Sequence, residues 1–281
     1  MVQRVLLIVN LHKQAAPILM EEIATALTEL GLVVDTCAFY GKPPAIQHKH
    51  YDVAITLGGD GTVLYAARCL AAQNIPIFPI NIGTLGFIAA SHPENWHTAF
   101  THWLEGKKTV SRRIMIQIQV WRNGTILYEH VCLNDGVISA SGIAKIIRLN
   151  VSTGEANLGP FRADGLIIAT PTGSTAYSVA AGGPIVDPEM EAFIINPICP
   201  FTLSNRPMVV PVSEKIHVIV DKDQRSSVLL TIDGQEVVSL EENDRVVFFK
   251  APFYANIISS DREMFYRVLK TKLNWSGGPD A

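Results

Sequence analysis

Four short stretches of this sequence combine small residues with groups that can bind a ligand or move a proton. The first, GGDGT at residues 58–62, places one carboxylate, Asp60, among three glycines directly after an apolar run. Glycine costs backbone entropy on folding, so this crowding indicates that a ligand approaches the backbone closely. A loop between a buried strand and a helix also presents main-chain N–H groups that attract phosphate. The residues expected to bind phosphate here are Gly58, Gly59, Gly61 and Thr62.

This loop has a second interpretation. It could be a turn in which Asp60 is only a local cap, with no part in chemistry. The sequence also predicts that Thr62 caps the N-terminus of the following helix. The loop is not a Walker P-loop, because no Lys-Ser or Lys-Thr follows the glycines.

Two further stretches carry polar groups next to glycine. NIGTLGFIA at 81–89 follows a predicted strand at the same carboxyl edge of the inferred sheet, where α/β proteins bind ligands. The alternative is an ordinary loop with Phe87 in the core. LNDGVIS at 133–139 contains Asn134, which donates and accepts hydrogen bonds, and Asp135, which accepts them when ionised. This pair suits a base edge and two ribose hydroxyls, whereas the alternative is a β-turn.

The fourth stretch, residues 161–186, crowds hydroxyl groups between small residues. Arg162 and Asp164 precede a predicted strand, and TPTGSTAY follows it. A dense set of small polar groups without charge favours a polar pocket. The alternatives are a hydroxyl-rich strand end and a tyrosine packed at an interface. The hydroxyl-bearing residues are Thr170, Thr172, Ser174, Thr175 and Tyr177.

Elements that position these residues follow from the hydrophobic pattern. Apolar runs predict strands, and apolar residues at helical spacing predict helices between them. Strands that alternate with helices imply a parallel sheet with right-handed crossovers. The predicted strands are 4–10, 32–39, 52–57 and 75–81, and the predicted helices are 17–30, 62–73 and 93–105.

The pattern changes near residue 110. Period-two stretches flank Asn123-Gly124, a strong hairpin signal, and short β-branched segments continue to about residue 250. We therefore predict an α/β N-terminal domain with a parallel sheet and a β-rich, antiparallel, sandwich-like C-terminal domain. Their expected bounds are 1–108 and 109–254, and a last helix within about 255–275 is expected to pack back on the first domain.

Composition excludes several classes of protein. The chain has 281 residues and a formal net charge of −3, and its Lys and Arg residues are scattered, so no nucleic-acid surface is expected. Two long uncharged stretches are broken by Gly, Pro and Asn, so neither predicts a membrane helix. The cysteines lie far apart, which predicts buried, reduced thiols in a cytoplasmic protein without disulfides or structural zinc. They are Cys37, Cys69, Cys132 and Cys199.

Together the motifs resemble those of the NAD kinase family. GGDGT, the Asn134–Asp135 pair, DGLIIATPTGSTAYS at 164–178 and DGQE at 233–236 occur in that family's order over nearly the whole chain. GGDGT alone is shared with diacylglycerol and sphingosine kinases and, distantly, with 6-phosphofructokinases, whereas its combination with TPTGSTAY is highly specific. The resemblance implies transfer of a phosphoryl group from ATP, or polyphosphate in some members, to the 2′-hydroxyl of the adenosine ribose of NAD, giving NADP.

The resemblance also implies a role for each motif residue. Asp60 would be the catalytic base, with Gly61 beside the ribose, and Asp164 would bind the nicotinamide half. Mg²⁺ or another divalent metal would accompany ATP, with no metal ligand assigned among the side chains and no prosthetic group. The NAD-binding residues would be Asp60, Gly61, Phe87, Asn134, Asp135, Lys145, Arg162, Asp164, Thr172, Thr175, Ala176, Tyr177, Ser178, Ala180 and Gln235.

Two positions depart from the family's pattern. Asp135 stands where many members have Glu, so its carboxylate is displaced by about one methylene group and its contact can run through water. Ala180 stands where Ser is frequent, which puts one hydroxyl contact in doubt.

The family implies NAD and ATP or polyphosphate as partners, a homodimer or homotetramer, and no nucleic acid or membrane. Two other functions fit the glycine loop. A lipid kinase of the diacylglycerol or sphingosine type would need an apolar acyl channel, whereas TPTGSTAYS indicates a compact polar pocket. A non-catalytic dinucleotide sensor would not need to keep the acid of GGDGT.

Overall fold

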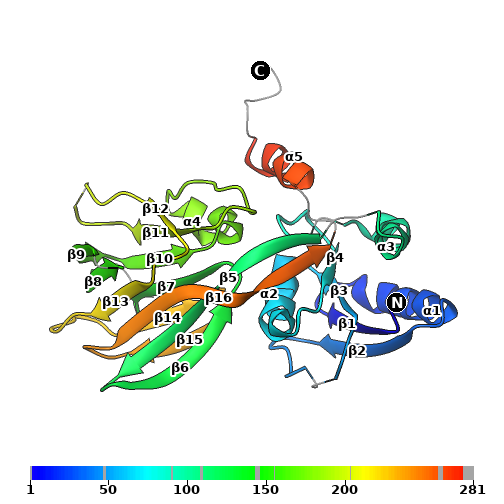
Figure 1. The fold of residues 1–281 in the computed structure, drawn as a ribbon, viewed down its shortest axis with the longest axis horizontal. Coiled ribbons are helices and arrows are strands. Elements are labelled where there is room, and N and C mark those ends of the chain that lie inside the picture. Colours follow the sequence, from blue (N-terminus) through cyan, green and yellow to red (C-terminus); the bar gives the residue numbers. More distant parts are fainter. Residues whose placement is uncertain are drawn as a thin grey trace. The chain divides into compact units, whose positions relative to one another are not determined.

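The computed structural model describes residues 2–46, 49–89, 91–107, 110–142, 146–154, 156–202, 204–258 and 262–274. The chain divides into two compact units, which are Met1–Arg113 with Phe253–Ala281, and Ile114–Pro252. The chain passes from one unit to the other twice, within the long strands β5 (Val110–Arg122) and β16 (Arg245–Ile258), as Figure 1 shows.

The first unit contains a parallel sheet in the order β2-β1-β3-β4, which the end of β16 joins through Ile257 and Ile77. This confirms the predicted α/β class. The strands are β1 (Arg4–Asn10), β2 (Val33–Phe39), β3 (Val53–Gly58) and β4 (Ile77–Asn81). The helices are α1 (Ala16–Glu29), α2 (Asp60–Leu70), α3 (Trp96–Leu104) and α5 (Arg262–Leu273), with short 3₁₀ turns at η1 (Ala71–Gln73) and η2 (Pro93–Asn95).

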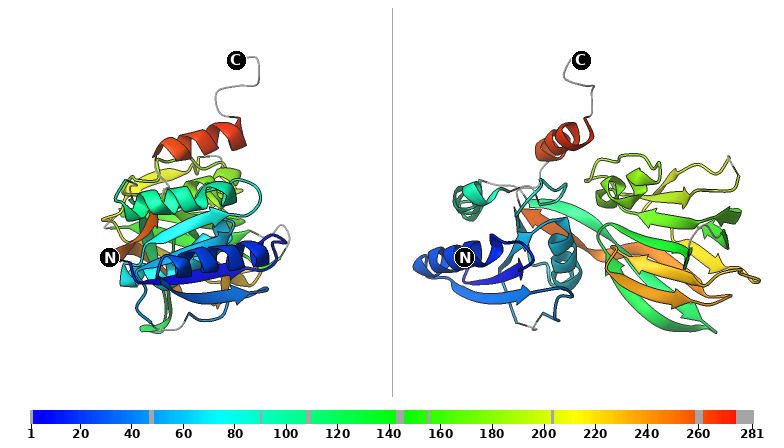
Figure 2. Two further views of the ribbon diagram at one scale, coloured as in Figure 1. Left: turned by 90° about the vertical axis from the view of Figure 1, so that its right-hand side faces the viewer. Right: turned by 180° about the vertical axis from the view of Figure 1, so that it is seen from behind.

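Burial explains why this sheet forms. Every residue of β3 and β4 is buried, as expected for strands covered on both faces. Ile23 and Leu27 of α1 and Phe100 of α3 share one core with Leu7 and Ile55 of the strands. Helix α2 contacts β1, β3 and β4, and Figure 2 shows α1 and α2 on opposite sides of the strands. The sheet is therefore held rigid beneath its loops.

The second unit is built from antiparallel strands, which confirms the predicted β-rich class. One sheet has the order β12-β11-β10-β7-β14-β15, and the other strands of the unit pair around β16 and β5. The strands are β6 (Thr125–Cys132), β7 (Asp135–Ala140), β8 (Ile147–Thr153), β9 (Ala156–Ala163), β10 (Gly165–Ala169), β11 (Ala192–Ile198), β12 (Met208–Pro211), β13 (Ile216–Val220), β14 (Val228–Ile232) and β15 (Glu236–Leu240). A 3₁₀ turn, η3 (Thr172–Thr175), leads into the short helix α4 (Tyr177–Ala180).

The predicted hairpin is present. Strands β5 and β6 pair up to Arg122 and Thr125, and Asn123 and Gly124 both have positive φ between them, 50° and 80°. Glycine and asparagine tolerate this left-handed conformation better than other residues.

Two predictions were wrong. Helix α2 begins at Asp60 with Gly59 as its N-cap, so Thr62 does not cap it but lies inside the first turn. Cys199 is exposed, in a turn after β11 where its φ is +44°. Cys132 is buried, Cys37 and Cys69 are half-buried, and all four thiols are free.

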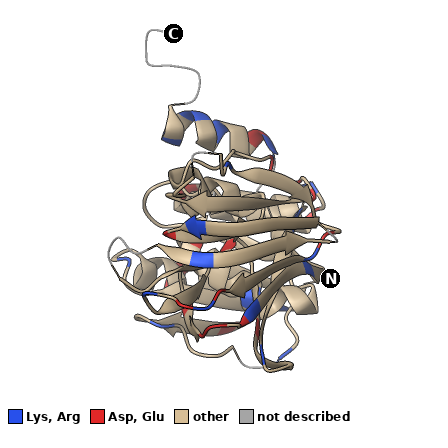
Figure 3. Ribbon diagram, turned by 90° about the vertical axis from the view of Figure 1, so that its left-hand side faces the viewer, with Lys and Arg blue, Asp and Glu red and all other residues tan. Residues whose placement is uncertain are grey.

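Basic and acidic residues are both spread over the fold (Figure 3). In Figure 3, Lys and Arg are interspersed with Asp and Glu over the ribbon. Across the described ranges, no helix has the length and apolar character needed to cross a bilayer.

Candidate functional site

The GGDGT loop stands at the carboxyl edge of the parallel sheet. Strands β3 and β4 pair in parallel with Gly58 opposite Asn81, so the loops that follow them start side by side. The Ile82 N–H donates to the Gly58 carbonyl at 2.8 Å. The two loops singled out in the first unit therefore form one structure.

Asp60 joins these loops through its side chain. Its Oδ2 accepts a hydrogen bond from the Phe87 N–H at 2.9 Å, and its Oδ1 accepts from Ile88 and Ala89 at 3.1 and 2.9 Å. A Cβ on Gly86 would lie 2.0 Å from Oδ1, so only glycine leaves room for the carboxylate. A carboxylate has about four acceptor positions. Three main-chain donors thus fix Asp60 and leave about one position for a ligand.

Gly58 and Thr62 pack against each other beneath the loop. A Cβ on Gly58 would lie 2.1 Å from Thr62 Oγ1, and Thr62 is 4% exposed. The structure therefore places the Thr62 hydroxyl in the interior, whereas Gly61 is exposed and a Cβ on Gly59 would meet nothing within 4 Å.

Lys13 is a basic group at this edge that the sequence analysis missed. Its Nζ lies 3.5 Å from the place where a Cβ on Gly83 would be, and Gly83 has φ of +125°. The signal was a charged residue shortly after β1, whose carboxyl end lies at the same edge of the sheet as that of β3.

Phe87 lies against the C-terminal helix. Its ring centroid is 6.3 Å from that of Phe265, and Lys272 Nζ lies 5.2 Å above it. Both partners belong to α5, and Phe87 is half-buried. This contact positions the segment that donates to Asp60.

The second unit contains a cavity of about 350 Å³, lined by both polar and apolar groups. It brings together four of the predicted NAD-binding residues, from the start of β7 with the residue before it and from the TPTGSTAY segment, with a group of residues near the end of β14. The lining residues are Asn134, Asp135, Val137, Ser139, Ala176, Tyr177, Thr231, Asp233 and Gly234.

The TPTG segment supports the backbone of Asn134. The Thr170 N–H donates to the Asn134 carbonyl at 2.8 Å, and the Thr170 hydroxyl donates to the Leu133 carbonyl at 2.5 Å. A Cβ on Gly173 would lie 2.1 Å from the Asn134 carbonyl oxygen, so the two backbones touch. TPTG is therefore needed to place Asn134.

Asp233 holds the same segment from the other side. Its carboxylate accepts hydrogen bonds from the N–H groups of Leu133 at 3.1 Å, Asn134 at 2.8 Å and Asp135 at 3.3 Å. The sequence analysis missed this residue as a site residue, although it begins the DGQE motif; no local pattern reports partners about 100 residues away.

Asp135 titrates near neutral pH. It is 4% exposed, and burial together with the negative charge of Asp233 raises its pKa from 3.8 to about 7. The sequence analysis treated Asp135 as an ionised acceptor, but near pH 7 a large share of it carries a proton.

Several predicted NAD-binding residues lie elsewhere in the second unit. Ser178 is fully buried and binds Asn196, whose Nδ2 donates to its carbonyl at 2.9 Å. Ala180 and Gln235 are exposed, and Arg162 stacks 4.7 Å from the centre of the Phe201 ring.

The remaining predicted residues are placed as follows. The Asp164 backbone bonds to Ile198 and Ala140 at the end of the sheet. Thr172 is 6% exposed, and the Thr175 hydroxyl donates to its carbonyl at 3.2 Å. Lys145 lies outside the described residues.

The donor groups suit a metal ion that arrives with a substrate. In the described part of the chain, no group of three or more His, Cys, Asp or Glu side chains is placed to hold a metal. Mg²⁺ is commonly bound by one or two carboxylates, waters and substrate phosphates, without a protein cage. The described side chains provide no such cage, so a divalent ion would be held chiefly by substrate phosphates and water.

Comparison with known proteins gives consistent matches. The ATP-NAD kinase N-terminal domain model matches residues 40–108, and the ATP-NAD kinase C-terminal domain model matches residues 133–260. An NAD kinase from Treponema denticola is 41% identical over 280 residues, which cover 98% of this chain and 97% of that protein.

Solved structures agree with this match. Yeast NADH kinase in complex with NADH has a TM-score of 0.89 over 99% of this chain and 89% of its own, at 22% identity, which speaks for the fold alone. An NAD kinase from Archaeoglobus fulgidus in complex with ATP has a TM-score of 0.76 at 27% identity, over 98% of this chain and all of its own. These matches give no support to the lipid kinase alternative.

Proposed function

Because the chain belongs to the NAD kinase family and is a kinase, we propose that it transfers a phosphoryl group from ATP to the 2′-hydroxyl of the adenosine ribose of NAD. The observation that carries this proposal is the Asp60 carboxylate, fixed by three main-chain N–H groups with about one acceptor position left. That position suits a hydroxyl group, which donates its hydrogen to the carboxylate.

Asp60 orients the attacking hydroxyl and takes its proton as the new P–O bond forms and the bond between the γ-phosphorus and ADP breaks, so that ADP leaves. Phosphoryl transfer has a loose transition state, in which positioning and charge neutralisation matter most. The proton is needed only late in that step. A rigid acceptor is therefore more useful than a strong base.

The second unit supplies the residues proposed to bind NAD. Asn134 and Asp135 offer hydrogen bonds to a base edge and to ribose hydroxyls, and Ala176 and Tyr177 also line the cavity. The exposed Tyr177 ring, at 48%, presents a face for stacking. The remaining family positions, from Lys145 and Arg162 to Gln235, stay part of this proposal.

Lys13, Gly59 and Gly61 are proposed to contact the donor phosphates. Lys13 supplies a positive charge beside Gly83, a Cβ on Gly59 would meet nothing within 4 Å, and Gly61 is exposed, so a phosphate can approach the loop closely. Mg²⁺ or a similar divalent ion arrives with ATP and neutralises its phosphates. We propose further that the protein is a cytoplasmic homodimer or homotetramer, on the strength of the family resemblance.

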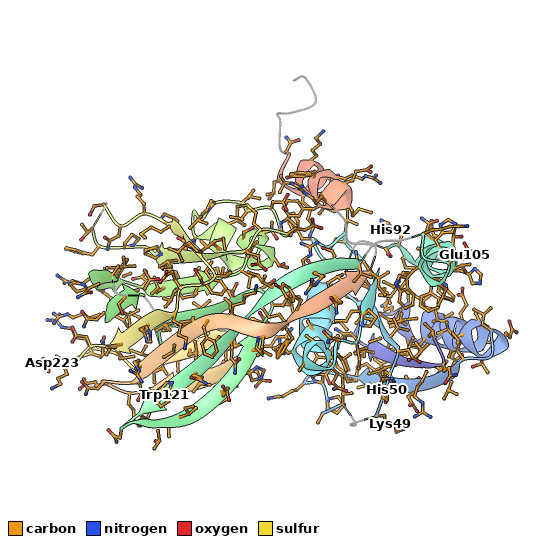
Figure 4. The ribbon with its side chains drawn as sticks, viewed as in Figure 1. Lys49, His50, His92, Glu105, Trp121 and Asp223 are labelled. Atoms are coloured by element: carbon orange, nitrogen blue, oxygen red, sulfur yellow. The ribbon has the colours of Figure 1, made fainter. Side chains whose placement is uncertain are left out.

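The test is NADP formation by two aspartate variants. Asp60→Asn should reduce kcat with ATP, Mg²⁺ and NAD by about 10²–10⁴-fold. Asp52→Asn is the matched control, because the Asp52 carboxylate also accepts main-chain hydrogen bonds, from Gln3 and Arg4 at 2.8 and 2.9 Å, but stands at the amino end of β3. Figure 4 labels its neighbour His50, whose Nε2 is 3.6 Å from Asp52 Oδ1.

Two outcomes would contradict the proposal that Asp60 is the proton acceptor of a kinase. Near-normal kcat in Asp60→Asn would contradict the assignment of the proton acceptor. NADP that binds tightly to the unmodified protein, with no turnover on ATP or polyphosphate, would instead support a dinucleotide sensor.

A further inference from the structure

The cavity of the second unit contains two buried carboxyl groups that are held differently. Asp233, 7% exposed, accepts three main-chain hydrogen bonds, and these donors stabilise its anion. Its own N–H donates to the Asp135 carbonyl at 2.9 Å. Asp233 and Asp135 are thus fixed against each other, and the charge of Asp233 is compensated by the backbone.

Within the described residues, the Asp135 carboxylate has no main-chain donors of this kind. It begins β7, and the flanking strands β10 and β14 contain no charged residue. Apart from Asp135, the titratable side chains that line the cavity are Asp233 and Tyr177. A second negative charge beside Asp233 is unfavourable in this buried setting, so a proton on Asp135 relieves the repulsion.

The cavity also lacks hydrogen-bond donors for one of its acceptors. Asn134 Oδ1 is buried and has no partner within the described residues. An unpaired buried acceptor is costly, which favours a ligand with O–H or N–H groups. A ribose with two free hydroxyls supplies two donors, and these can replace the proton as the groups that stabilise an Asp135 carboxylate.

We propose that Asp233 is a positioning residue of the dinucleotide cavity: it fixes Leu133–Asp135 and makes Asp135 release a proton when ribose hydroxyls of NAD bind. This inference rests on the proposed function for its ligand. The proton passes from Asp135 to solvent buffer, and the ribose O–H groups then donate to the carboxylate. NAD consequently binds more tightly as the pH rises.

The expected size follows from linkage. With a pKa of about 7 for Asp135 in the free protein, the Kd for NAD should fall about tenfold between pH 6 and pH 8. At pH 7 about half a proton should be released per NAD bound, because about half of Asp135 is protonated. Isothermal titration calorimetry in buffers of different ionisation enthalpy measures both quantities on the unmodified protein, without ATP.

Variants test the pair. Asp135→Asn should bind NAD more weakly with a Kd that does not change with pH. Asp233→Asn should weaken binding at pH 8, and should move the pH dependence to lower pH because the like charge is gone. The matched control is Asp223→Asn, which also has positive φ, +61° against +48° for Asp233, but is exposed in a turn outside the cavity. It should keep the unmodified Kd and proton release.

The results separate this inference from the proposed function. A Kd that changes less than about twofold from pH 6 to pH 8, with no proton released, would overturn the inference even if NADP is formed. Proton release that is the same in Asp233→Asn as in the unmodified protein would also overturn it. Proton-linked NAD binding without any NADP formation would instead contradict the proposed function and leave the inference standing.

Discussion

Asp60 and Asp135 show how the environment gives two aspartates different chemistry. Main-chain donors surround the Asp60 carboxylate, so its orientation is fixed. Asp135 has burial and a like charge instead, which raise its pKa to about 7. The first residue therefore suits a fixed acceptor, and the second suits binding that is coupled to a proton.

Gly86→Ala should remove activity without unfolding the protein. The added Cβ would meet the Asp60 carboxylate, the far end of a side chain that can rotate away, and not a backbone atom. We expect kcat to fall about 10²-fold, the usual cost of displacing a catalytic group by about 1 Å. NADP formation and the thermal unfolding midpoint, measured together, check this.

A double variant shows whether both changes act through one carboxylate. If Gly86→Ala works by displacing Asp60, then adding it to Asp60→Asn should cost little more, because effects on a shared group are not additive. Losses that multiply would show that Gly86 acts through something else.

Local pattern predicted Asp60, Asn134 and Asp135, because each stands in a short motif with a physical explanation. It could not find Asp233 as the residue that holds Asn134, since that contact joins positions 99 residues apart. Nor could it show that Asp135 titrates near pH 7. That property depends on burial and on a neighbour from another strand.

At the scale of elements, Asp52 ties the start of β3 to β1. Its carboxylate accepts hydrogen bonds from Arg4 and Gln3, which lower its pKa. A lowered pKa stabilises the folded protein at pH values above the pKa of the unfolded state, about 3.9. This stability is lost as the pH falls through the lower pKa of the folded state. Asp52→Asn should therefore lower the free energy of unfolding by about 1 kcal/mol at pH 7 and by much less near pH 2. Urea unfolding at both pH values measures this, and an equal loss at both would contradict it.

Strand β5 is tied to the turn before β16 by a bidentate ion pair. Arg122 Nε and Nη2 donate to the two carboxylate oxygens of Asp244 at 2.8 and 2.7 Å, and Asp244 is fully buried. Arg122→Ala leaves that charge buried without this partner, so it should lower the free energy of unfolding. Adding Asp244→Asn should restore most of the loss. No recovery in the double variant would show that Arg122 acts through packing. A substitution of the neighbouring Trp121, which Figure 4 labels, is the comparison for such a packing effect on the free energy of unfolding.

Some strands of the second unit have a weak local signal in the sequence. Strands β9, β11 and β12 each contain a proline, at positions 160, 197 and 211. Proline removes a ladder donor and lowers the strand signal, so pairing with neighbours decides these segments. The strands of the parallel sheet were predicted within two residues. The buried strands β1, β3 and β4 are largely apolar runs, as is typical of parallel strands covered on both faces.

At the scale of the whole molecule, the first unit is discontinuous in sequence and the second is not. Residues 1–113 and 253–281 form the first unit, so the chain returns to it only after the second is complete. If the second unit unfolds alone, the two parts of the first become joined by a long flexible loop, and loop entropy grows only slowly with length. The first unit can therefore keep its fold when the second opens.

Ligand binding gives a way to see this division. NAD bound to the cavity of the second unit should add about 2.7 kcal/mol to its free energy of unfolding at a free concentration of 100 times Kd. Hydrogen exchange should show this increase in β7, β10 and β14, and a smaller one in β1 and β3, because local stability differs between cooperative units. Asp135→Asn at the same NAD concentration should lose much of the increase, since it binds NAD more weakly. An equal increase in all five strands would mean that the molecule unfolds as one cooperative unit, with NAD stabilising both sheets alike.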